Sequence, residues 1–488
     1  MEDHRGKSYA IACAILASMT SILLGYDIGV MSGAAIFIKD DLKISDTQVE
    51  ILLGILNLYS LVGSYAAGFT SDWIGRRYTI AFAGSIFFAG ALLMGFATNY
   101  AFLMVGRFVA GVAVGYAMMI APVYTAEVAP ASSRGFLTSF PEVFINFGIL
   151  LGYVSNYAFA RLRLTLGWRL MLGVGAIPSV FLAIGVLAMP ESPRWLVMKG
   201  RLGEAKRVLE KTSDTPEEAQ LRLADIKAAA GIITEGGNDD FVPVSKKTHE
   251  EGLWKELLLR PSPPVRRVLL TAVGIHFFQQ ASGIDSVVLY SPRVFEKAGI
   301  HDKSKLLGTT VAVGFTKTIS VLVSIFFSDS VGRRPLLLSS IGGMVLSLTG
   351  LGLGLTLIDH HPDGELRWAI GLCIASILAY VAFFSVGLGP LAWVCSCEIL
   401  PLRVRAQGAS IGVAVNRGTS GAITMTFISL YKAITIGGSF FLYGGMAAAA
   451  WVFFFTCLPE TQGRTLEDME EYLGTRKDDA EEAGGIDA

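Results

Sequence analysis

Twelve apolar stretches, each about 20 to 30 residues long, divide this chain of 488 residues. A helix of about 20 apolar residues crosses the hydrocarbon core of a bilayer, so each stretch is a candidate transmembrane span. Charged residues make up only 17% of the sequence and gather between the stretches, which favours a lipid bilayer and no nucleic acid as the partner. The expected spans are about 9–35, 48–70, 78–98, 101–126, 136–160, 168–190, 267–291, 305–328, 335–358, 367–396, 406–431 and 437–458.

The loops predict how the chain is oriented. Arginines gather in the loops on one side of the expected spans, whereas the opposite loops are neutral, mixed or acidic apart from Arg161 and Arg163. By the positive-inside rule, both termini and the long segment 191–266 face the cytoplasm. Within that segment, 203–210 and 215–230 are expected to form short amphipathic helices with solvated charges, and a docking site is the less favoured alternative.

Three charged motifs recur in the same order in both halves of the chain, about 257 to 271 residues apart. Such a repeat predicts an all-α membrane protein whose twelve transmembrane helices form two pseudo-symmetric six-helix halves. We expect an N-terminal half at 1–190, a cytoplasmic helical linker at 191–266, a C-terminal half at 267–458 and a cytoplasmic tail at 459–488. The motif pairs are D-x-x-G-R-R at 72–77 and 329–334, E-x-x-P-x-x-x-R at 127–134 and 398–405, and P-E at 190–191 and 459–460.

Asp27 is the one residue in the first apolar stretch that can carry a charge. A carboxylate near the middle of a membrane is costly and usually marks a transport pathway or a proton site. Gly25, Gly29 and Gly33 surround it at four-residue spacing, which predicts close contact with another helix. The alternative is a structural aspartate permanently paired with an arginine.

The motifs together resemble the sugar porters of the major facilitator superfamily. The resemblance rests on the D-x-x-G-R-R loops, E-x-x-P-x-x-x-R-G, P-E-S-P-R and the final P-E-T-x-G-R, and it covers nearly the whole chain. The stretches GYDIGVMSGA, SFPEVFIN, FFQQASGIDSVVLYSPR and VAVNRGTSG resemble the plant polyol and monosaccharide transporters. The resemblance implies the major facilitator fold, with Asp27 as the proton acceptor and Arg107 in the fourth span as its counter-ion.

Polar residues in the second half predict a sugar site, because side-chain amides both donate and accept as hydroxyl groups do. Gly283 should break the seventh span, and Gly387, Gly389 and Pro390 should kink the tenth. The resemblance implies that the corresponding Gln, Trp and Asn positions bind sugar. Read singly, each has an alternative role in helix packing. The expected substrate-binding residues are Gln279, Gln280, Asp285, Trp393, Asn416, Glu142 and Lys317.

Several of these residues depart from the sugar-porter pattern. Asp285, Glu142, Lys317 and Arg417 stand where neutral residues are common in the family, so we expect charge-compensated pairs. Lys317 and Arg417 should be neutralised by Glu142 or Asp285, and the sequence leaves the pairing open. We interpret His276, one turn before Gln280, as a packed and hydrogen-bonded histidine, with a proton relay as the less favoured alternative.

The charged motif residues are interpreted as a cytoplasmic latch. Ion pairs across the two halves would hold that side shut and break in each cycle, since exposed pairs contribute only about 0 to 1 kcal/mol each. The alternative is that the arginines serve only to set topology. The latch would comprise Asp72, Arg76, Arg77, Glu127, Arg134, Glu191, Arg194, Asp329, Arg333, Arg334, Glu398, Arg405 and Glu460.

These features predict a proton-coupled symporter that imports linear polyols of the sorbitol, xylitol and mannitol type and monosaccharides. A facilitative uniporter and a non-transporting sugar sensor are the alternatives. Without a G-x-x-x-x-G-K-[ST] loop or a nucleophile–base arrangement, neither ATP-driven transport nor an enzyme is supported. All five cysteines lie in apolar stretches, so we expect buried thiols and no metal. We further expect no cofactor, a monomer and a plasma-membrane location.

Overall fold

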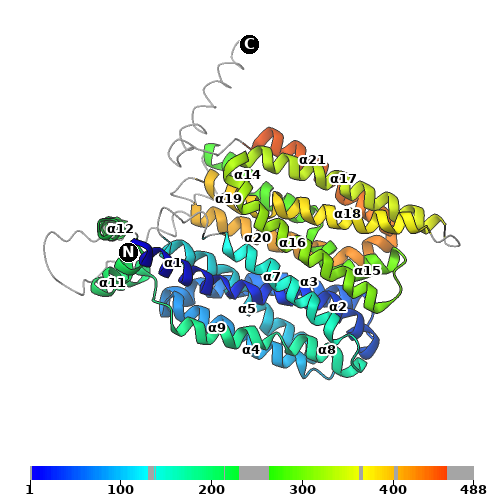
Figure 1. The fold of residues 1–488 in the computed structure, drawn as a ribbon, viewed down its shortest axis with the longest axis horizontal. Helices are drawn as coiled ribbons and strands as arrows, with labels where there is room; N and C mark the ends of the chain where they lie inside the picture. The colour runs from blue at the N-terminus through cyan, green and yellow to red at the C-terminus, as the bar shows by residue number, and fades with distance from the viewer. Residues whose placement is uncertain are drawn as a thin grey trace, which may run out of the picture. The chain divides into compact units, whose positions relative to one another are not determined.

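The computed structural model describes residues 3–129, 137, 139–213, 215–229, 263–361, 366–400 and 405–458 (Figure 1). Within these ranges, the side chains of 3–7, 229, 263–265, 328–330, 397–398 and 405–407 are not described. The elements are all α-helices. The chain divides into two compact units, Met1–Lys247 and Thr248–Ala488.

The first unit holds six transmembrane spans, followed by three shorter helices. Met19 separates α1 from α2, but the two continue one another as a single apolar span, Ser8–Leu42. The helices are α1 (Asp3–Ser18), α2 (Thr20–Leu42), α3 (Asp46–Ile74), α4 (Arg76–Gly95), α5 (Tyr100–Val128), α7 (Phe140–Phe159), α8 (Leu164–Gly173), α9 (Ala176–Leu187), α10 (Pro193–Met198), α11 (Leu202–Thr212) and α12 (Pro216–Ala229).

The second unit also holds six spans, and two of them are broken. Gly283, with a positive φ of 84°, separates α14 from α15, and Gly387 separates α18 from α19. Both breaks confirm the sequence prediction. The helices are α14 (Pro263–Ala281), α15 (Ile284–Lys297), α16 (Lys303–Val331), α17 (Arg333–His360), α18 (Arg367–Val386), α19 (Leu388–Ile399), α20 (Arg405–Ile434) and α21 (Ile436–Cys457).

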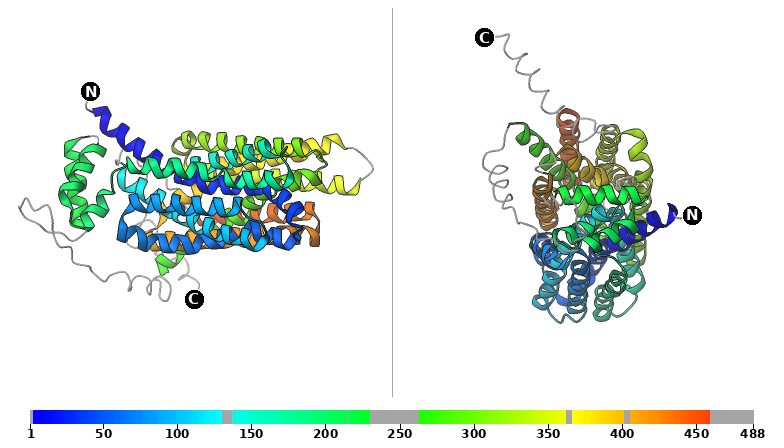
Figure 2. Two further views of the ribbon diagram at one scale, coloured as in Figure 1. Left: turned by 90° about the horizontal axis from the view of Figure 1, so that it is seen from below. Right: turned by 90° about the vertical axis from the view of Figure 1, so that its left-hand side faces the viewer.

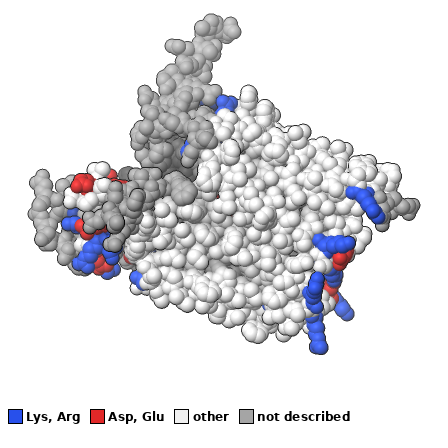
Figure 3. Space-filling view, in the orientation of Figure 1, with Lys and Arg blue, Asp and Glu red and all other residues white. Residues whose placement is uncertain are grey.

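Nine spans in the described part of the chain are long and apolar enough to cross a membrane by length and composition. The other three predicted spans are helical too, as α7, α14–α15 and α20, and they are less apolar because they carry several polar residues. The twelve predicted spans are therefore all present as helices. On the face seen in Figure 3, broad areas carry no Lys, Arg, Asp or Glu, and the charges gather at the ends.

Local sequence sets where several helices begin. Ser45 starts α3 with a capping box, because its Oγ accepts from Gln48 N while the Gln48 side chain accepts from Ser45 N. Asn99 and Asp302 cap α5 and α16 in the same way through side-chain oxygens that accept backbone N–H groups. Such caps satisfy donors that a helix leaves unpaired at its start.

The internal repeat is visible in the backbone. Gly75 and Gly332, each the glycine of a D-x-x-G-R-R motif, both have a φ of 98°, which favours glycine. The second arginine after each glycine donates to a carbonyl near the end of the sixth membrane span of its own unit. Arg77 Nη2 donates to Leu187 O at 2.5 Å, and Arg334 Nη2 donates to Phe455 O at 2.6 Å.

The helices α2 and α7 pack at very short distance through glycine. A Cβ added to Gly25 would overlap Ile145 O, one added to Gly29 would overlap Ile149 O, and one added to Gly33 would overlap the Asn156 side chain. This confirms the close contact predicted from the glycine spacing, and it fixes the position of the helix that carries Asp27.

The segment after the sixth span forms α10, α11 and α12, and α11 and α12 lie close to where the two short helices were expected. In Figure 2 these helices lie beyond one end of the blue and cyan helices of their unit. Trp195, Leu196, Leu202 and Ala205 form their small core, with Leu223 packed against it.

Candidate functional site

Asp27 and Arg107 form a buried ion pair in the first unit. Arg107 Nη1 donates to Asp27 Oδ2 at 2.6 Å, and both side chains are 1% exposed. Arg107 Nε also donates to Leu52 O of α3 at 3.1 Å, so three helices meet at the pair. Breaking a buried pair by removing one partner is strongly destabilising, because it leaves an uncompensated charge.

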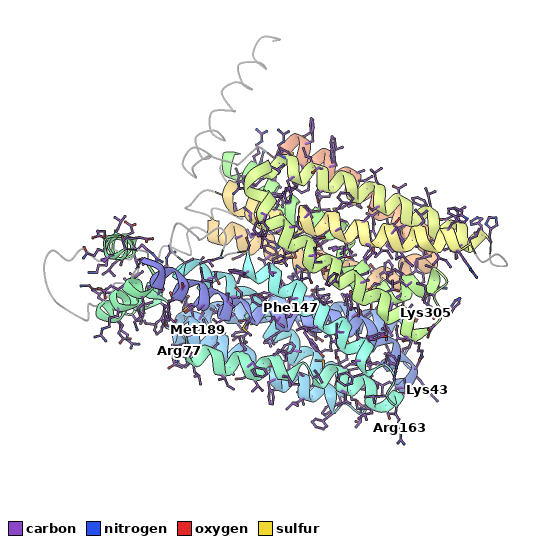
Figure 4. The ribbon with its side chains drawn as sticks, in the orientation of Figure 1. Lys43, Arg77, Phe147, Arg163, Met189 and Lys305 are labelled. Atoms are coloured by element: carbon purple, nitrogen blue, oxygen red, sulfur yellow. The ribbon has the colours of Figure 1, made fainter. Side chains whose placement is uncertain are left out.

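The Asp27–Arg107 pair lies near the middle of the membrane span and not at one of its ends. Figure 4 shows Arg77 and Met189 at one end of the first unit and Lys43 and Arg163 at the other, with Phe147 between them. Asp27 falls near the middle of the Ser8–Leu42 span. A carboxylate at this depth can exchange a proton only through a path that opens to water.

A second charged cluster lies at the Arg77 end of the unit. The Arg76 guanidinium donates to Asp72 Oδ1 at 2.9 Å and to Glu127 Oε2 at 3.2 Å. Glu127 also accepts the Ser192 hydroxyl. These contacts join the ends of α3, α4 and α5 within one unit, so Asp72, Arg76 and Glu127 of the predicted latch lie together.

Glu191 caps the start of α4. Its carboxylate accepts the backbone N–H groups of Arg76 at 2.8 Å, Arg77 at 3.2 Å and Ser192 at 2.8 Å. It packs against Gly75, where any Cβ would overlap it. Burial raises the pKa of the Glu191 carboxyl above its ordinary value, and the three backbone N–H groups and the Arg76 charge oppose this rise.

The raised pKa of Glu191 predicts a pH-dependent stability. An acid whose pKa is raised on folding adds stability that is fully present below its unfolded pKa and is lost as pH rises through its folded pKa. Acidification from pH 7 to pH 4 should therefore stabilise the parent chain relative to Glu191→Gln, because the glutamine side chain does not titrate. Melting in detergent from pH 7 to pH 4 tests this, with the exposed Glu217→Gln as control. Parallel curves for the parent chain and Glu191→Gln would contradict it.

Arg222 of α12 binds the end of α5. Its Nη2 group lies within hydrogen-bonding distance of three successive carbonyl oxygens, Glu127 O at 3.3 Å, Val128 O at 3.3 Å and Ala129 O at 3.1 Å. A cation at a helix C-terminus interacts favourably with the unpaired carbonyls and the helix dipole. The extramembrane segment is thus attached to the helix that carries Arg107.

The remaining predicted latch residues are only partly described. Arg194 is exposed, and Arg334 stacks over Phe455 at 5.5 Å from the ring centre. Arg333 begins α17. Arg134 and Glu460, and the side chains of Asp329, Glu398 and Arg405, lie outside the described residues. Ion pairs between the two halves stay a prediction.

In the second unit, the predicted amides form one hydrogen-bonded cluster. Asn416 Nδ2 donates to Gln279 Oε1 at 2.7 Å, and Gln280 Nε2 donates to Asn416 Oδ1 at 3.2 Å. Gln279 Nε2 donates to Gly389 O at 2.8 Å, at the break in the tenth span. The cluster therefore joins α14, α20 and the interrupted α18–α19 span, and all three amide side chains are buried.

Trp393 borders this cluster through His276. The His276 ring lies edge-on to the indole, with ring centres 4.7 Å apart, and His276 Nε2 lies 3.1 Å from Ser396 Oγ. His276 is 1% exposed. The interpretation of His276 as a packed, hydrogen-bonded residue is confirmed, and the same contacts place it beside the amides.

The charged residues of the second unit contact different groups. Asp285 accepts the Ser420 hydroxyl, and Lys317 Nζ lies 5.6 Å from the centre of the Phe384 ring. Arg417 donates to Asn416 Oδ1 from Nε at 3.1 Å and from Nη2 at 2.8 Å. The pairing of Lys317 and Arg417 with Glu142 or Asp285 stays a prediction.

Glu142 lies in the first turn of α7, where α7 begins at the Arg77 end of the unit. Its Oε1 accepts from Asn146 Nδ2 at 3.2 Å.

Two buried amides on α7, Asn146 and Asn156, were not predicted as functional. Asn156 Nδ2 donates to Gly29 O at 3.0 Å, two residues beyond Asp27. Their signal in the sequence is an amide within an otherwise apolar span.

Within the described part of the chain, no group of three or more His, Cys, Asp and Glu side chains could hold a metal ion. Cys13, Cys373 and Cys395 are buried free thiols, and Cys457 is half-buried. The expectation of buried thiols is confirmed for the first three, and the side chain of Cys397 lies outside the described residues.

The fold and these buried polar clusters define a twelve-helix membrane transporter of the major facilitator type. A family model described as "Sugar (and other) transporter" matches residues 13–473. The chain belongs to this sugar transporter family, so the predicted family and fold class are confirmed, as is the prediction that the chain is not an enzyme.

Similar proteins agree with this assignment. "Polyol transporter 5" of Arabidopsis thaliana is 67% identical over 465 residues, which cover 95% of this chain and 86% of the relative. The "Glucose transporter GlcP" of Staphylococcus epidermidis is 34% identical, and the match covers 95% of this chain and 97% of the relative.

Solved structures show the same architecture. The inward open conformation of the xylose transporter XylE from E. coli matches with a TM-score of 0.77 and 26% identity, covering 95% of this chain and 100% of that one. A second structure, described as the proton:xylose symporter XylE bound to 6-bromo-6-deoxy-D-glucose, matches with a TM-score of 0.76 and 27% identity, covering 96% and 99%.

Proposed function

We propose that this chain is a proton symporter that imports linear polyols, of the sorbitol, xylitol and mannitol type, together with monosaccharides. The observation that carries the proposal is the Asp27–Arg107 pair, buried at mid-span with an N–O distance of 2.6 Å. Burying such a pair costs desolvation free energy, and an ionisable residue inside a membrane span usually marks a transport pathway or a proton site. The names of the relatives, polyol, glucose and proton:xylose transporters, support the substrate class and the coupling ion.

In this mechanism, protonation of Asp27 neutralises the carboxylate and releases Arg107 to its remaining partner, Leu52 O. The bond that breaks joins α2 to α5, so protonation weakens a contact inside the first unit. The substrate amides lie in the second unit. Asp27 therefore controls the conformational change and does not bind the substrate.

The cytoplasmic latch belongs to the same proposal. We place the Arg77 end of the first unit, with α10–α12, in the cytoplasm, together with both termini, and the protein in the plasma membrane as a monomer. The arginines at this end and the positive-inside rule support this orientation. The half boundaries at residues 190, 266 and 458 are part of the proposal.

Uptake measurements test the proposal directly. Currents recorded in oocytes across a panel of polyols and sugars at two external pH values should be inward and larger at the lower pH. Uptake that ignores external pH and a protonophore would show a facilitative uniporter instead. Absence of any response to polyols with a response to glucose would overturn the polyol assignment, and absence of uptake altogether would favour a sensor.

A further inference from the structure

The hydrogen position on His276 is fixed by its neighbours. Ser396 Oγ donates its single hydrogen to Trp393 O at 3.0 Å. It can therefore only accept from His276 Nε2, 3.1 Å away, so Nε2 carries the imidazole hydrogen. In the neutral ring the other nitrogen, Nδ1, is then a hydrogen-bond acceptor without a hydrogen.

The same reasoning fixes the amides. Arg417 can only donate, and it donates twice to Asn416 Oδ1. Asn416 must then turn Nδ2 to Gln279, while Gln280 must present Nε2 to Asn416 Oδ1. Gln280 Oε1 consequently makes no hydrogen bond to the other amides, and it too is an acceptor.

These two acceptors, His276 Nδ1 and Gln280 Oε1, are buried and have no hydrogen-bond partner within the described part of the chain. Gln279 lies beside the imidazole, but its amide nitrogen donates to Leu388 O at 3.3 Å and Gly389 O at 2.8 Å. His276 and Gln280 are four residues apart on α14, so they lie on the same face of the helix. A buried polar atom without a hydrogen-bond partner lowers the stability of the folded chain, so such an atom in a native structure needs an explanation.

We propose that His276 Nδ1 accepts a hydrogen bond from a substrate hydroxyl, and that the site selects substrates by the hydroxyl hydrogens they donate to His276 Nδ1 and Gln280 Oε1. This inference rests on the proposed function, since it names the chemical basis of recognition at that same site. Each acceptor is satisfied by one substrate hydroxyl, whereas a deoxy carbon or a fluorine has no hydrogen to donate.

Positioning of the imidazole is part of the proposal. Ser396 holds Nε2, Trp393 lies edge-on to the ring, and Gly412 of α20 leaves space that a Cβ would take from the imidazole. A site built to accept a substrate hydroxyl discriminates strongly against an analogue that lacks it, because the acceptor is then left buried and unpaired.

The test is uptake by the full-length chain in yeast of sorbitol and of its mono-deoxy and mono-deoxyfluoro analogues at each carbon. In the parent chain, both replacements at one carbon should raise KM by at least about tenfold. His276→Phe keeps an aromatic ring and loses both nitrogens. In this variant the ratio of the analogue's KM to that of sorbitol should fall to about threefold or less at that carbon alone. His276→Asn retains an amide oxygen that can reach the position of Nδ1, so this variant should recover part of the parent chain's KM ratio. The exposed His301→Phe is the matched control.

An unchanged pattern of discrimination in His276→Phe would overturn the inference. If His276→Phe does not reach the membrane, Ser396→Ala carries the same test, because losing the Ser396 acceptor lets the hydrogen move to Nδ1. The preference should then fall at the same carbon, and an unchanged preference would again overturn the inference. Failure of the proposed function is a separate result, in which the parent chain takes up neither sorbitol nor any parent sugar.

Discussion

Replacing Asp27 with asparagine is expected to abolish accumulation of substrate against its gradient. One coupled charge yields about 2.3 kcal/mol per 100 mV, enough for about fiftyfold accumulation of a neutral solute. An asparagine amide cannot take up a proton, so in this variant the internal-to-external ratio should fall to about one and lose its dependence on external pH. Accumulation of labelled sorbitol in proteoliposomes, with an imposed potential and pH gradient, measures both effects.

Asparagine mimics the neutral, protonated carboxyl, so Arg107 is released to Leu52 O as in the proposed cycle, and the variant should still exchange internal for external substrate. The matched control is Asp41→Asn on the same helix, because Asp41 also pairs with an arginine, Arg169, at 3.2 Å. That pair is partly exposed and lies at the Lys43 end. Asp41→Asn should accumulate substrate as the parent chain does. Accumulation by Asp27→Asn that still depends on pH would remove Asp27 from the coupling mechanism.

The second large effect is expected from Gly29→Ala. The new Cβ would overlap Ile149 O and approach Ile149 Cα to 2.9 Å, and backbone atoms cannot rotate aside. The two helices must separate, which also strains the Asn156–Gly29 hydrogen bond of 3.0 Å. Overpacking of this kind costs about 1 to 3 kcal/mol, which for a unit the size of Met1–Lys247 corresponds to a melting temperature lower by roughly 2 to 6 °C.

Melting of the detergent-solubilised chain, followed by size-exclusion chromatography after heating, measures this change. Gly68→Ala on α3 is the control, because nothing lies within 4 Å of a Cβ at that position. Alanine is favoured over glycine in a helix by up to about 1 kcal/mol, so Gly68→Ala should leave the melting temperature unchanged or raise it. Equal stability of the two variants would contradict the close packing of α2 on α7.

Much of the fold could be predicted from the sequence because it follows from local chemistry. Span length sets the twelve helices, and glycine marks the break at Gly283 and the close contact at Gly29. The pairing of Asp27 with Arg107 was implied by the resemblance to the sugar porters, and the structure brings the two together. Their role in coupling stays a prediction.

The polar network of the second unit could not be predicted in detail. Which amide faces which depends on the three-dimensional approach of α14, α19 and α20, and the residue types alone allow many pairings. The breaks at Gly283 and Gly387 shift the register of the following helices, so spacing along the chain does not give distances. On α7, the charge of Glu142 led to a predicted site in the first turn, whereas the buried Asn146, one turn further along the helix, was missed.

The contact of Arg222 with the last carbonyls of α5 has a mechanical consequence. Twenty residues separate Arg107 from Glu127 on α5. Because an α-helix rises about 1.5 Å per residue, the Asp27–Arg107 pair and the Arg222 contact lie about 30 Å apart along this one helix, which acts as a rigid rod. A displacement of α12 is transmitted along that rod. Pro122 lies within α5 near the Arg222 contact, and a proline is where a helix bends. A bend at Pro122 would change how far a displacement of α12 moves Arg107.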